Sequence, residues 1–367
     1  MNGQADDWGG TDSFVDVRPR PGEQEYYDSA PKPSSSFLEL RDLRVHFPTD
    51  DGLVKSADGL SFTLERGRTL GIVGESGSGK SVTSLAIMGL HKDTRAKITG
   101  EIWLDGEELV AASAERVRSL RGKKMAMIFQ DPLSAMHPYY TVGTQIIEAY
   151  RIHNKVSKAA ARRHAIEMLD RVGIPQPSSR VDDYPHQFSG GMRQRAMIAM
   201  ALSCDPELLI ADEPTTALDV TTQAQVLALL DRLVDEHRTA VILITHNLGI
   251  VSDFCDSVAV MYAGRFVETS GVDHIFLSPT HPYSEALLKC VPNPERLAEG
   301  PLPAITGFPP DLSRLPSGCA FAPRCPVGRE IPQCHEQAPE PQRVEGSSGA
   351  ATVECHFAAQ RIAEVTR

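Results

Sequence analysis

The sequence predicts an α/β fold in which a mostly parallel sheet is covered by helices. Two short apolar runs, LLIAD and AVILIT, are separated by a stretch with helical periodicity, QAQVLALLDRLVDEH. This alternation is typical of a parallel sheet flanked by helices. A glycine-rich turn between a strand-like run and a helix-like run, GESGSGKS at residues 74–81, favours the same class.

The length of the chain allows about two domains of roughly 150 residues each. Its 367 residues are 41% apolar, which is enough to bury a sizeable core. Residues 1–36 are rich in Pro, Ser, Gly and Asp and contain few apolar positions. Such a segment buries too little surface to offset its chain entropy, so the sequence predicts a disordered N-terminal tail there.

Ordered structure is expected to begin at residue 37. The alternation in FLELRDLRVHF predicts a strand, and SFTLERGRTLGIVG predicts two more strands broken by a glycine turn. A helix is predicted to start near Lys80 and to run through SVTSLAIMGL. KITGEIWLDGEEL then predicts a hairpin, and MAMIFQDP a buried strand that ends in a loop.

The middle of the chain changes to helical periodicity. From Thr141 to about Arg171, apolar residues recur at three- and four-residue spacing, and GMRQRAMIAMALSC predicts a further helix. We expect a helical subdomain at about 135–200 inside a domain of residues 37–280, which ends with the hairpin SVAVMYAGRFVETS. Beyond it, proline becomes frequent and four cysteines cluster, which predicts a small C-terminal domain of residues 281–367.

The net charge and the absence of long apolar runs limit the function classes. A net charge of −11 argues against a protein that coats nucleic acid, because such proteins usually carry a basic face. No apolar run reaches the length of about 18 residues that a membrane span needs. The start MNGQADDWGG lacks the pattern of a secretory signal. We expect a cytoplasmic chain that can still dock on a membrane protein.

Residues 74–81 fit the phosphate-binding pattern G-x-x-x-x-G-K-S. Glycines let backbone N–H groups turn toward phosphate oxygens, and the start of the following helix adds a positive dipole end. Lys80 is expected to reach the β- and γ-phosphates and the Ser81 hydroxyl to ligate Mg²⁺. A chance glycine turn is the alternative, which the flanking strand and helix disfavour. The candidate phosphate ligands are Gly74, Ser76, Gly77, Ser78, Gly79, Lys80 and Ser81.

LLIADEP, residues 208–214, supplies the acidic half of such a site. An apolar strand that ends in Asp212 is expected to place a carboxylate beside the Mg²⁺ ion. Glu213, one position on, can face the γ-phosphate and polarise the attacking water. Strands often end in acidic residues, so this pair is informative only together with the glycine-rich turn.

Three further stretches bear on the class. HQFSGGMRQR places Ser189, Gly190 and Gly191 at the start of a predicted helix, which is a second anion-binding terminus with no obvious role within one chain. TTALD places Asp219 shortly after the acidic pair, and ITHNL places His246 at the end of a strand, where it can sense the γ-phosphate. Each stretch alone is ordinary.

Together and in this order, these stretches resemble the ATPase subunits of ABC transporters over residues 37–285. GESGSGKS resembles the Walker A motif, Gln130 the Q-loop, FSGGM the signature, LLIADE Walker B, ALD the D-loop and His246 the switch. The resemblance implies a P-loop NTPase (RecA-like) ABC ATPase core with an antiparallel β subdomain and a helical subdomain. It implies Glu213 and His246 as catalytic residues, and Ser81, Gln130 and Asp212 around Mg²⁺.

The family also implies a head-to-tail dimer. The signature helix of one subunit would close on the ATP that the Walker A motif of the other holds, which accounts for the second helix terminus. Two departures stand out. The signature reads FSGGM in place of LSGGQ, although Ser189 and the glycines are retained. The place near Asp51 where family members carry an adenine-stacking aromatic has none, and Phe47 is the candidate substitute.

The C-terminal side resembles the oligopeptide and dipeptide importer branch, with nickel importers as close relatives. The residues that carry this resemblance are SPTHPYSEALL and GFPPDLSRLPSGCAFAPRCP. It implies an ATP-hydrolysing subunit that powers peptide import from the cytoplasmic face of the cell membrane. The implied partners are a second ATPase chain in a heterodimer, two permease subunits and an extracellular solute-binding protein, with no nucleic acid. FQDPLSAMHPYYTVG is suited to transmit motion to a permease helix.

Four cysteines in the last 49 residues are separated by 5, 8 and 20 residues. This spacing is neither the C-x-x-C pairing of zinc sites nor the tight run of bacterial ferredoxins. Four thiolates in a small proline-rich segment still indicate a metal that stabilises it. The peptide-importer resemblance implies a [4Fe–4S] cluster; zinc is the second candidate, unligated thiols are the third, and His335 and His356 could replace a ligand. The cysteines are Cys319, Cys325, Cys334 and Cys355.

Other interpretations stay open on the sequence alone. A soluble ABC protein that acts on ribosomes or nucleic acid usually has two ATPase halves or long insertions, whereas this chain has one half and an acidic balance. A non-hydrolysing regulatory subunit is a further class, which the presence of Glu213 opposes. The cargo could also be nickel or haem.

Overall fold

Two sheets form the framework of the described residues. A four-stranded sheet has the order β2-β1-β4-β5, and an eight-stranded sheet has the order β11-β12-β10-β9-β3-β8-β7-β6. The structure is a computed structural model that describes residues 36–92, 94–216, 218–291, 304–343 and 351–365. The predicted disordered tail lies outside the described residues, apart from residue 36.

The four-stranded sheet is antiparallel throughout. Its strands are β1 (Leu38–Thr49), β2 (Gly52–Leu64), β4 (Lys97–Leu104) and β5 (Glu107–Glu108). β1 pairs with both β2 and β4. Leu38, Leu40 and Leu43 of β1 are fully or almost fully buried. The apolar alternation that predicted the first strand therefore marks the face that this sheet turns to the core.

The centre of the larger sheet is parallel. Neighbouring strands β6, β7, β8, β3 and β9 all pair in parallel, and β10 pairs with β9 antiparallel. The short β12 then pairs with β10, so the C-terminal segment extends this sheet. The strands are β3 (Thr69–Val73), β6 (Met125–Ile128), β7 (Leu208–Asp212), β8 (Ala240–Ile244), β9 (Ser257–Tyr262), β10 (Arg265–Gly271), β11 (Gln342–Arg343) and β12 (Thr352–Val353).

The central strands are buried on both faces, as a parallel sheet requires. Within β7, Leu208 and Ile210 face one apolar cluster, shared with the antiparallel sheet, whereas Leu209 and Ala211 face another, shared with the helices. The continuous apolar runs seen in the sequence follow from this double burial. The predicted α/β class and the separate antiparallel β subdomain are confirmed.

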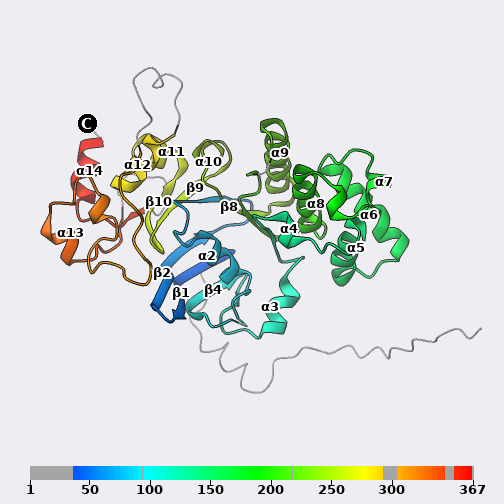
Figure 1. Cartoon of the computed structure of the whole chain (residues 1–367), viewed down its shortest axis with the longest axis horizontal. Coiled ribbons are helices and arrows are strands. Elements are labelled where there is room, and N and C mark those ends of the chain that lie inside the picture. Colours follow the sequence, from blue (N-terminus) through cyan, green and yellow to red (C-terminus); the bar gives the residue numbers. More distant parts are fainter. Residues whose placement is uncertain (1–35, 93, 217, 292–303, 344–350, 366–367) are drawn as a thin grey trace, which may run out of the picture. The chain divides into compact units, whose positions relative to one another are not determined.

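Helices α5 to α8 gather on the right of the view in Figure 1, and helices α11 to α14 lie toward its left. Helix α5 packs on α6, and both contact α8. The helices are α2 (Lys80–Ile87), α3 (Ala114–Leu120), α4 (Pro132–Ala135), α5 (Val142–His153), α6 (Lys158–Arg171), α7 (Pro177–Arg180), α8 (Gly190–Leu202), α9 (Val220–His237), α10 (Leu248–Phe254), α11 (Val272–Leu277), α12 (Pro282–Lys289), α13 (Pro332–Glu336) and α14 (Ala358–Val365), with 3₁₀ turns η1 (Pro185–Gln187) and η3 (Ala322–Arg324).

Side-chain caps explain where the helices of the middle segment begin. Thr141, Ser157 and Ser189 each precede a helix, and each side-chain oxygen accepts a hydrogen bond from the backbone N–H three residues on. Such caps satisfy an amide that the helix itself leaves unpaired. The helices at 142–153, 158–171 and 190–202 therefore start close to where periodicity alone predicts them.

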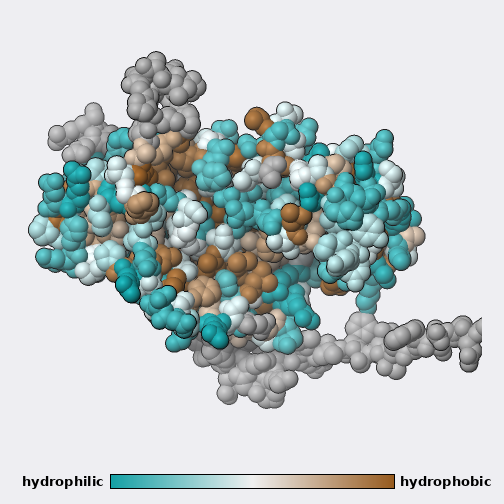
Figure 2. Space-filling model, viewed as in Figure 1, coloured by the Kyte–Doolittle hydropathy of each residue, from teal (hydrophilic) through white to brown (hydrophobic). Residues whose placement is uncertain are grey.

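The surface is mixed in character. On the face shown in Figure 2, small groups of apolar side chains lie among hydrophilic ones. Among the residues that the structure describes, none of the helices combines the length and the apolar character needed to cross a bilayer.

Candidate nucleotide-binding site

The glycine-rich turn lies between β3 and α2, at the carboxyl end of a central parallel strand. Gly79 has a φ of 108°, and a Cβ placed on it would lie 2.0 Å from the Ser56 carbonyl oxygen. A Cβ on Gly74 would lie 2.1 Å from the carbonyl oxygen of Met261. Only glycine allows these close backbone approaches. The surrounding fold therefore requires glycine at both positions and fixes the shape of the turn.

Lys80 lies folded over this turn. Its Nζ donates to the carbonyl oxygens of Gly74 at 2.8 Å and Glu75 at 2.9 Å. Burial lowers the pKa of Lys80, and the nearby carboxylates of Glu213, Asp212 and Glu75 oppose that shift. The ammonium group can exchange its carbonyl partners for phosphate oxygens, which are stronger acceptors.

Asp212 ends β7 with its side chain buried. The residue is 4% exposed, and its Oδ1 has no hydrogen-bond partner among the described residues. Burial raises the pKa of this carboxyl group, whereas a hydrogen bond from Ser81 and the charge of Lys80 lower it. A buried carboxylate oxygen without a partner is costly. Mg²⁺, which takes oxygen ligands, would satisfy it, so Ser81 and Asp212 fit the expected metal site.

The Glu213 carboxylate contacts side chains from three other positions in the sequence. Its Oε2 accepts hydrogen bonds from Gln130 Nε2 at 3.1 Å and from Thr216 Oγ1 at 3.0 Å, and its Oε1 lies 3.3 Å from His246 Nδ1. Its backbone has a φ of 49°, in the left-handed region that non-glycine residues seldom adopt. The structure therefore brings Gln130, Glu213 and His246 together. Thr216 is an additional contact that the sequence did not reveal, although it belongs to the TTALD stretch.

The signature residues lie apart, at the start of α8. Ser189 and Gly190 are exposed, and Ser189 Oγ accepts a hydrogen bond from the backbone of Met192 at 3.3 Å. A Cβ on Gly191 would lie 3.3 Å from Leu218, whereas one on Gly190 would meet nothing within 4 Å. Among the described residues, therefore, no neighbour requires glycine at position 190.

Asp219 and His246 differ in how they are held. Asp219 caps α9, since its carboxylate accepts hydrogen bonds from the Thr222 backbone at 3.0 Å and hydroxyl at 2.8 Å. The backbone and side-chain hydrogen bonds of Thr222 lower the pKa of Asp219. The His246 side chain is 64% exposed, so its ring is open to a ligand or a partner on one side.

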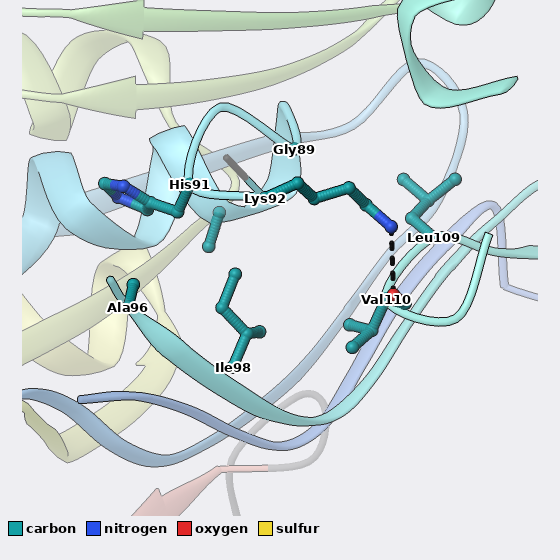
Figure 3. Close-up of a pocket in the computed structure, with 8 residues that line it drawn as sticks. Gly89, His91, Lys92, Ala96, Ile98, Leu109 and Val110 are labelled. Carbon is teal, nitrogen blue, oxygen red and sulfur yellow. Dashed lines mark hydrogen bonds between the residues drawn. The ribbon is translucent and has the colours of Figure 1, made fainter. Parts of the chain in front are cut away.

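Phe47, the candidate for adenine stacking, packs edge-on against His91 with 5.3 Å between ring centroids. His91 also lines a pocket of about 190 Å³ near the end of α2. In this pocket Lys92 Nζ donates to the Val110 carbonyl oxygen at 2.9 Å (Figure 3). The lining of the pocket includes none of the expected phosphate ligands, so it is distinct from the glycine-rich turn.

All four C-terminal cysteines line one small cavity, together with Phe321 and His356. The space is about 20 Å³, room for about one water molecule. The Gly328 N–H donates to Cys325 Sγ at 3.2 Å. Burial raises the pKa of the Cys319 thiol to about 11, and the neighbouring cysteines add to the shift. Within the described ranges, no group of three or more His, Cys, Asp or Glu is arranged to hold a metal ion.

Comparisons with known proteins agree with this geometry. The ABC transporter family matches residues 57–216, and the family of the oligopeptide/dipeptide transporter C-terminal region matches residues 267–334. The oligopeptide transport ATP-binding protein OppD of Salmonella typhimurium is 50% identical over 311 residues, covering 84% of this chain and 91% of the relative. OppD of Bacillus subtilis is 51% identical over 296 residues, with 80% and 83% covered.

Solved structures show the same fold. The ATP-binding cassette MJ0796, in a dimeric post-hydrolysis state bound to ADP and Pi, matches with a TM-score of 0.59 at 23% identity and covers 64% of this chain and 98% of its own. The structure of cbiO1 from Clostridium perfringens, part of the cbiONQ ABC transporter complex, matches with a TM-score of 0.55 at 26% identity and covers 66% and 91%.

Proposed function

This chain belongs to the ATP-binding proteins of ABC transporters of the oligopeptide type, and from that premise we propose that it hydrolyses ATP to power peptide import. The observation that carries the proposal is the convergence of Gln130 and His246 on Glu213, beside Lys80 and Asp212. The ABC family and the named relatives, which are oligopeptide transport ATP-binding proteins, support it.

We assign the chemistry to this chain's own side chains. Lys80 and the N–H groups of the turn hold the β- and γ-phosphates. Glu213 accepts a hydrogen bond from the attacking water and turns it toward the γ-phosphate, while His246 contacts the γ-phosphate from the other side. Ser81, Gln130 and Asp212 would hold Mg²⁺, which neutralises phosphate charge when it is bound.

A second ATPase subunit is part of the proposal. Ser189 and Gly190 are exposed at a helix start, where N–H groups favour an anion. A Cβ on Gly190 would contact none of the described residues of its own chain, which fits a position kept small for the ATP of a partner subunit. We propose a head-to-tail pair, with a different ATPase chain as the second member and Asp219 near the shared boundary.

Gly190→Ala tests this arrangement. The added Cβ meets no described residue of its own chain within 4 Å, so thermal stability and ATP binding by the isolated subunit should stay at the wild-type level. In the closed pair the methyl group would crowd the partner's ATP and lower turnover about tenfold, a typical cost of overpacking. Assembled ATPase activity and single-chain ATP affinity are the two measurements. Wild-type turnover by the variant would contradict the shared site.

The proposed membrane contact is the segment that follows Gln130. Leu133, Tyr139 and Tyr140 are exposed there, and Tyr139 is 82% exposed. Large exposed apolar side chains close to an active site suit a protein partner better than water. We propose that this surface docks on one of two permease subunits at the cytoplasmic face of the membrane, in a complex fed by an extracellular solute-binding protein.

We further propose that the four cysteines hold a [4Fe–4S] cluster, with zinc as the second candidate. Support comes from the chemistry of the donors, because four thiols from separate segments share one cavity and one of them already accepts an N–H hydrogen bond. Cys₄ sets are the usual ligands of such clusters. A cluster would have to widen the cavity, and when bound it would cross-link these segments, which are short and rich in proline.

Anaerobic purification decides between the metals. The wild-type chain should be brown, with broad absorption near about 400 nm and about four irons per chain. Cys325→Ser should lose colour and iron, whereas Cys204→Ser should keep both, because Cys204 lies outside the cavity near Ala149. A colourless wild-type chain that contains zinc would reject the cluster.

The function itself is tested on the assembled complex. The tagged chain is co-purified from membranes, its companion chains are identified, and ATPase activity in proteoliposomes is measured with and without di- and oligopeptides. Peptide-stimulated hydrolysis together with permease companions supports the proposal. Hydrolysis that only ribosomes or nucleic acid stimulate, with no permease present, would overturn it.

A further inference from the structure

The second residue of the phosphate-binding turn is held by the C-terminal region. Arg324 Nη1 donates to Glu75 Oε2 at 2.6 Å, and its Nη2 donates to Oε1 at 2.9 Å. The Arg324 side chain is only 5% exposed. A bidentate arginine–carboxylate pair of this kind is strong and geometrically specific. Its two members lie 249 residues apart in the sequence.

The same residue is held a second time through its backbone. The N–H of Glu75 donates to the hydroxyl oxygen of Tyr283 at 2.9 Å. Tyr283 is fully buried at the start of α12, and its ring lies 4.6 Å from that of Tyr262 and 5.2 Å from that of Phe321. The tyrosine is therefore a fixed acceptor, and one N–H of the turn is paired with the C-terminal region.

Arg324 is itself anchored. Its Nε donates to the Thr306 carbonyl oxygen at 3.0 Å, and its Nη1 donates to Tyr262 Oη at 3.2 Å. The next residue, Cys325, lines the cysteine cavity. Two consecutive residues, Arg324 and Cys325, thus connect the phosphate-binding turn with the cysteine cavity.

The charge of Glu75 is expected to affect how tightly the turn binds ATP. Glu75 lies close enough to Lys80 for its carboxylate to act on the ammonium group that is expected to hold the γ-phosphate. Without a cationic partner, the Glu75 carboxylate would repel the triphosphate and compete with it for the Lys80 ammonium group. Arg324 neutralises Glu75 and at the same time fixes the direction of its side chain.

We propose that Tyr283 and Arg324 are positioning residues of the phosphate-binding turn, through which the C-terminal region sets the affinity of this subunit for ATP. The inference rests on the proposed ATP binding at residues 74–81 and extends it. A merely structural pair would change thermal stability and leave the affinity of the folded protein for ATP unchanged. A positioning pair changes that affinity in the folded protein, and its effect depends on the charge of Glu75.

The test measures ATP affinity on the full-length chain, purified anaerobically, with a fluorescent ATP analogue and a thermal unfolding curve for each variant. Arg324→Ala should weaken ATP binding about tenfold, because truncating one member of a buried charge pair leaves the other unpaired. The double variant Glu75→Gln/Arg324→Ala removes the stranded charge as well. It should recover affinity to within about threefold of wild type.

Two further variants complete the design. Arg329→Ala, an exposed arginine five residues along the chain, should bind ATP like the wild type. Tyr283→Phe keeps the ring packing but removes the acceptor of the Glu75 N–H, so it should weaken ATP binding without lowering the unfolding temperature as a cavity would. An Arg324→Ala chain with wild-type affinity, or a double variant as weak as the single one, would overturn the inference. A wild-type chain that fails to bind ATP would instead reject the proposed function.

Discussion

Replacing Glu213 with glutamine is expected to lower ATP turnover about 100- to 10,000-fold, the usual contribution of a general base, while ATP stays bound. The substitution keeps the size of the side chain and its amide can still pair with Thr216, but it removes the charge that draws a proton from water. Because Lys80, Ser81 and Asp212 remain, binding is retained and hydrolysis is lost. Phosphate release and retention of labelled ATP by the assembled complex are the measurements.

Glu236→Gln is the matched control for this experiment. It makes the same change of charge at an exposed position near the end of α9. We expect its turnover to equal that of the wild type. If the Glu213 variant hydrolyses ATP and transports peptide at the normal rate, the role given to this carboxylate is wrong.

Gly79→Ala is expected to reduce ATP affinity about 100-fold or more, because relieving a severe backbone overlap costs about 3 kcal/mol. The new Cβ would lie 2.0 Å from the Ser56 carbonyl oxygen, and the residue has a φ of 108°. Either β2 or the turn must move, and any movement of the turn displaces the N–H groups and Lys80 that are proposed to hold phosphate. ATP affinity and the unfolding temperature of the full chain are measured together.

Gly106→Ala separates strain from overlap. Gly106 has a φ of 83°, but a Cβ placed on it would meet none of the described residues within 4 Å, so only the conformational cost of about 1 kcal/mol applies. This variant should lose a little stability and keep wild-type ATP affinity. Equal losses of affinity in the two glycine variants would show that the overlap at Gly79 is not the cause.

The parallel centre of the fold could be predicted because its strands are buried on both faces and read as unbroken apolar runs. Other elements left weaker signals. β2 begins at Gly52, whereas the apolar pattern predicted a strand only at 61–64. The first four residues of β2 are exposed or half-buried, so they carry no apolar pattern that would reveal the strand. β11 and β12 are two residues long each, too short for any periodicity, and their place in the sheet depends on β10.

Some residues of the candidate site could likewise be predicted from the sequence, whereas others could not. Gln130, Glu213 and His246 follow the carboxyl ends of strands, and the ABC resemblance implied that they share one site. The contacts made by Glu75 are different, because Arg324 and Tyr283 lie far along the chain and no local pattern links them to the turn. The sequence marked both stretches only as features of the peptide-importer branch. The ABC resemblance is confirmed.

The left-handed backbone of Glu213 has a consequence for how the chain tolerates change. Asparagine or glycine would adopt that conformation more readily, and either would relieve about 1 kcal/mol of strain. Such a subunit would have less backbone strain than the wild type but would not hydrolyse ATP. It would still be able to assemble into the transporter. At this position, thermal stability and catalytic activity favour different residues. A screen for thermal stability alone is therefore expected to select inactive variants of Glu213.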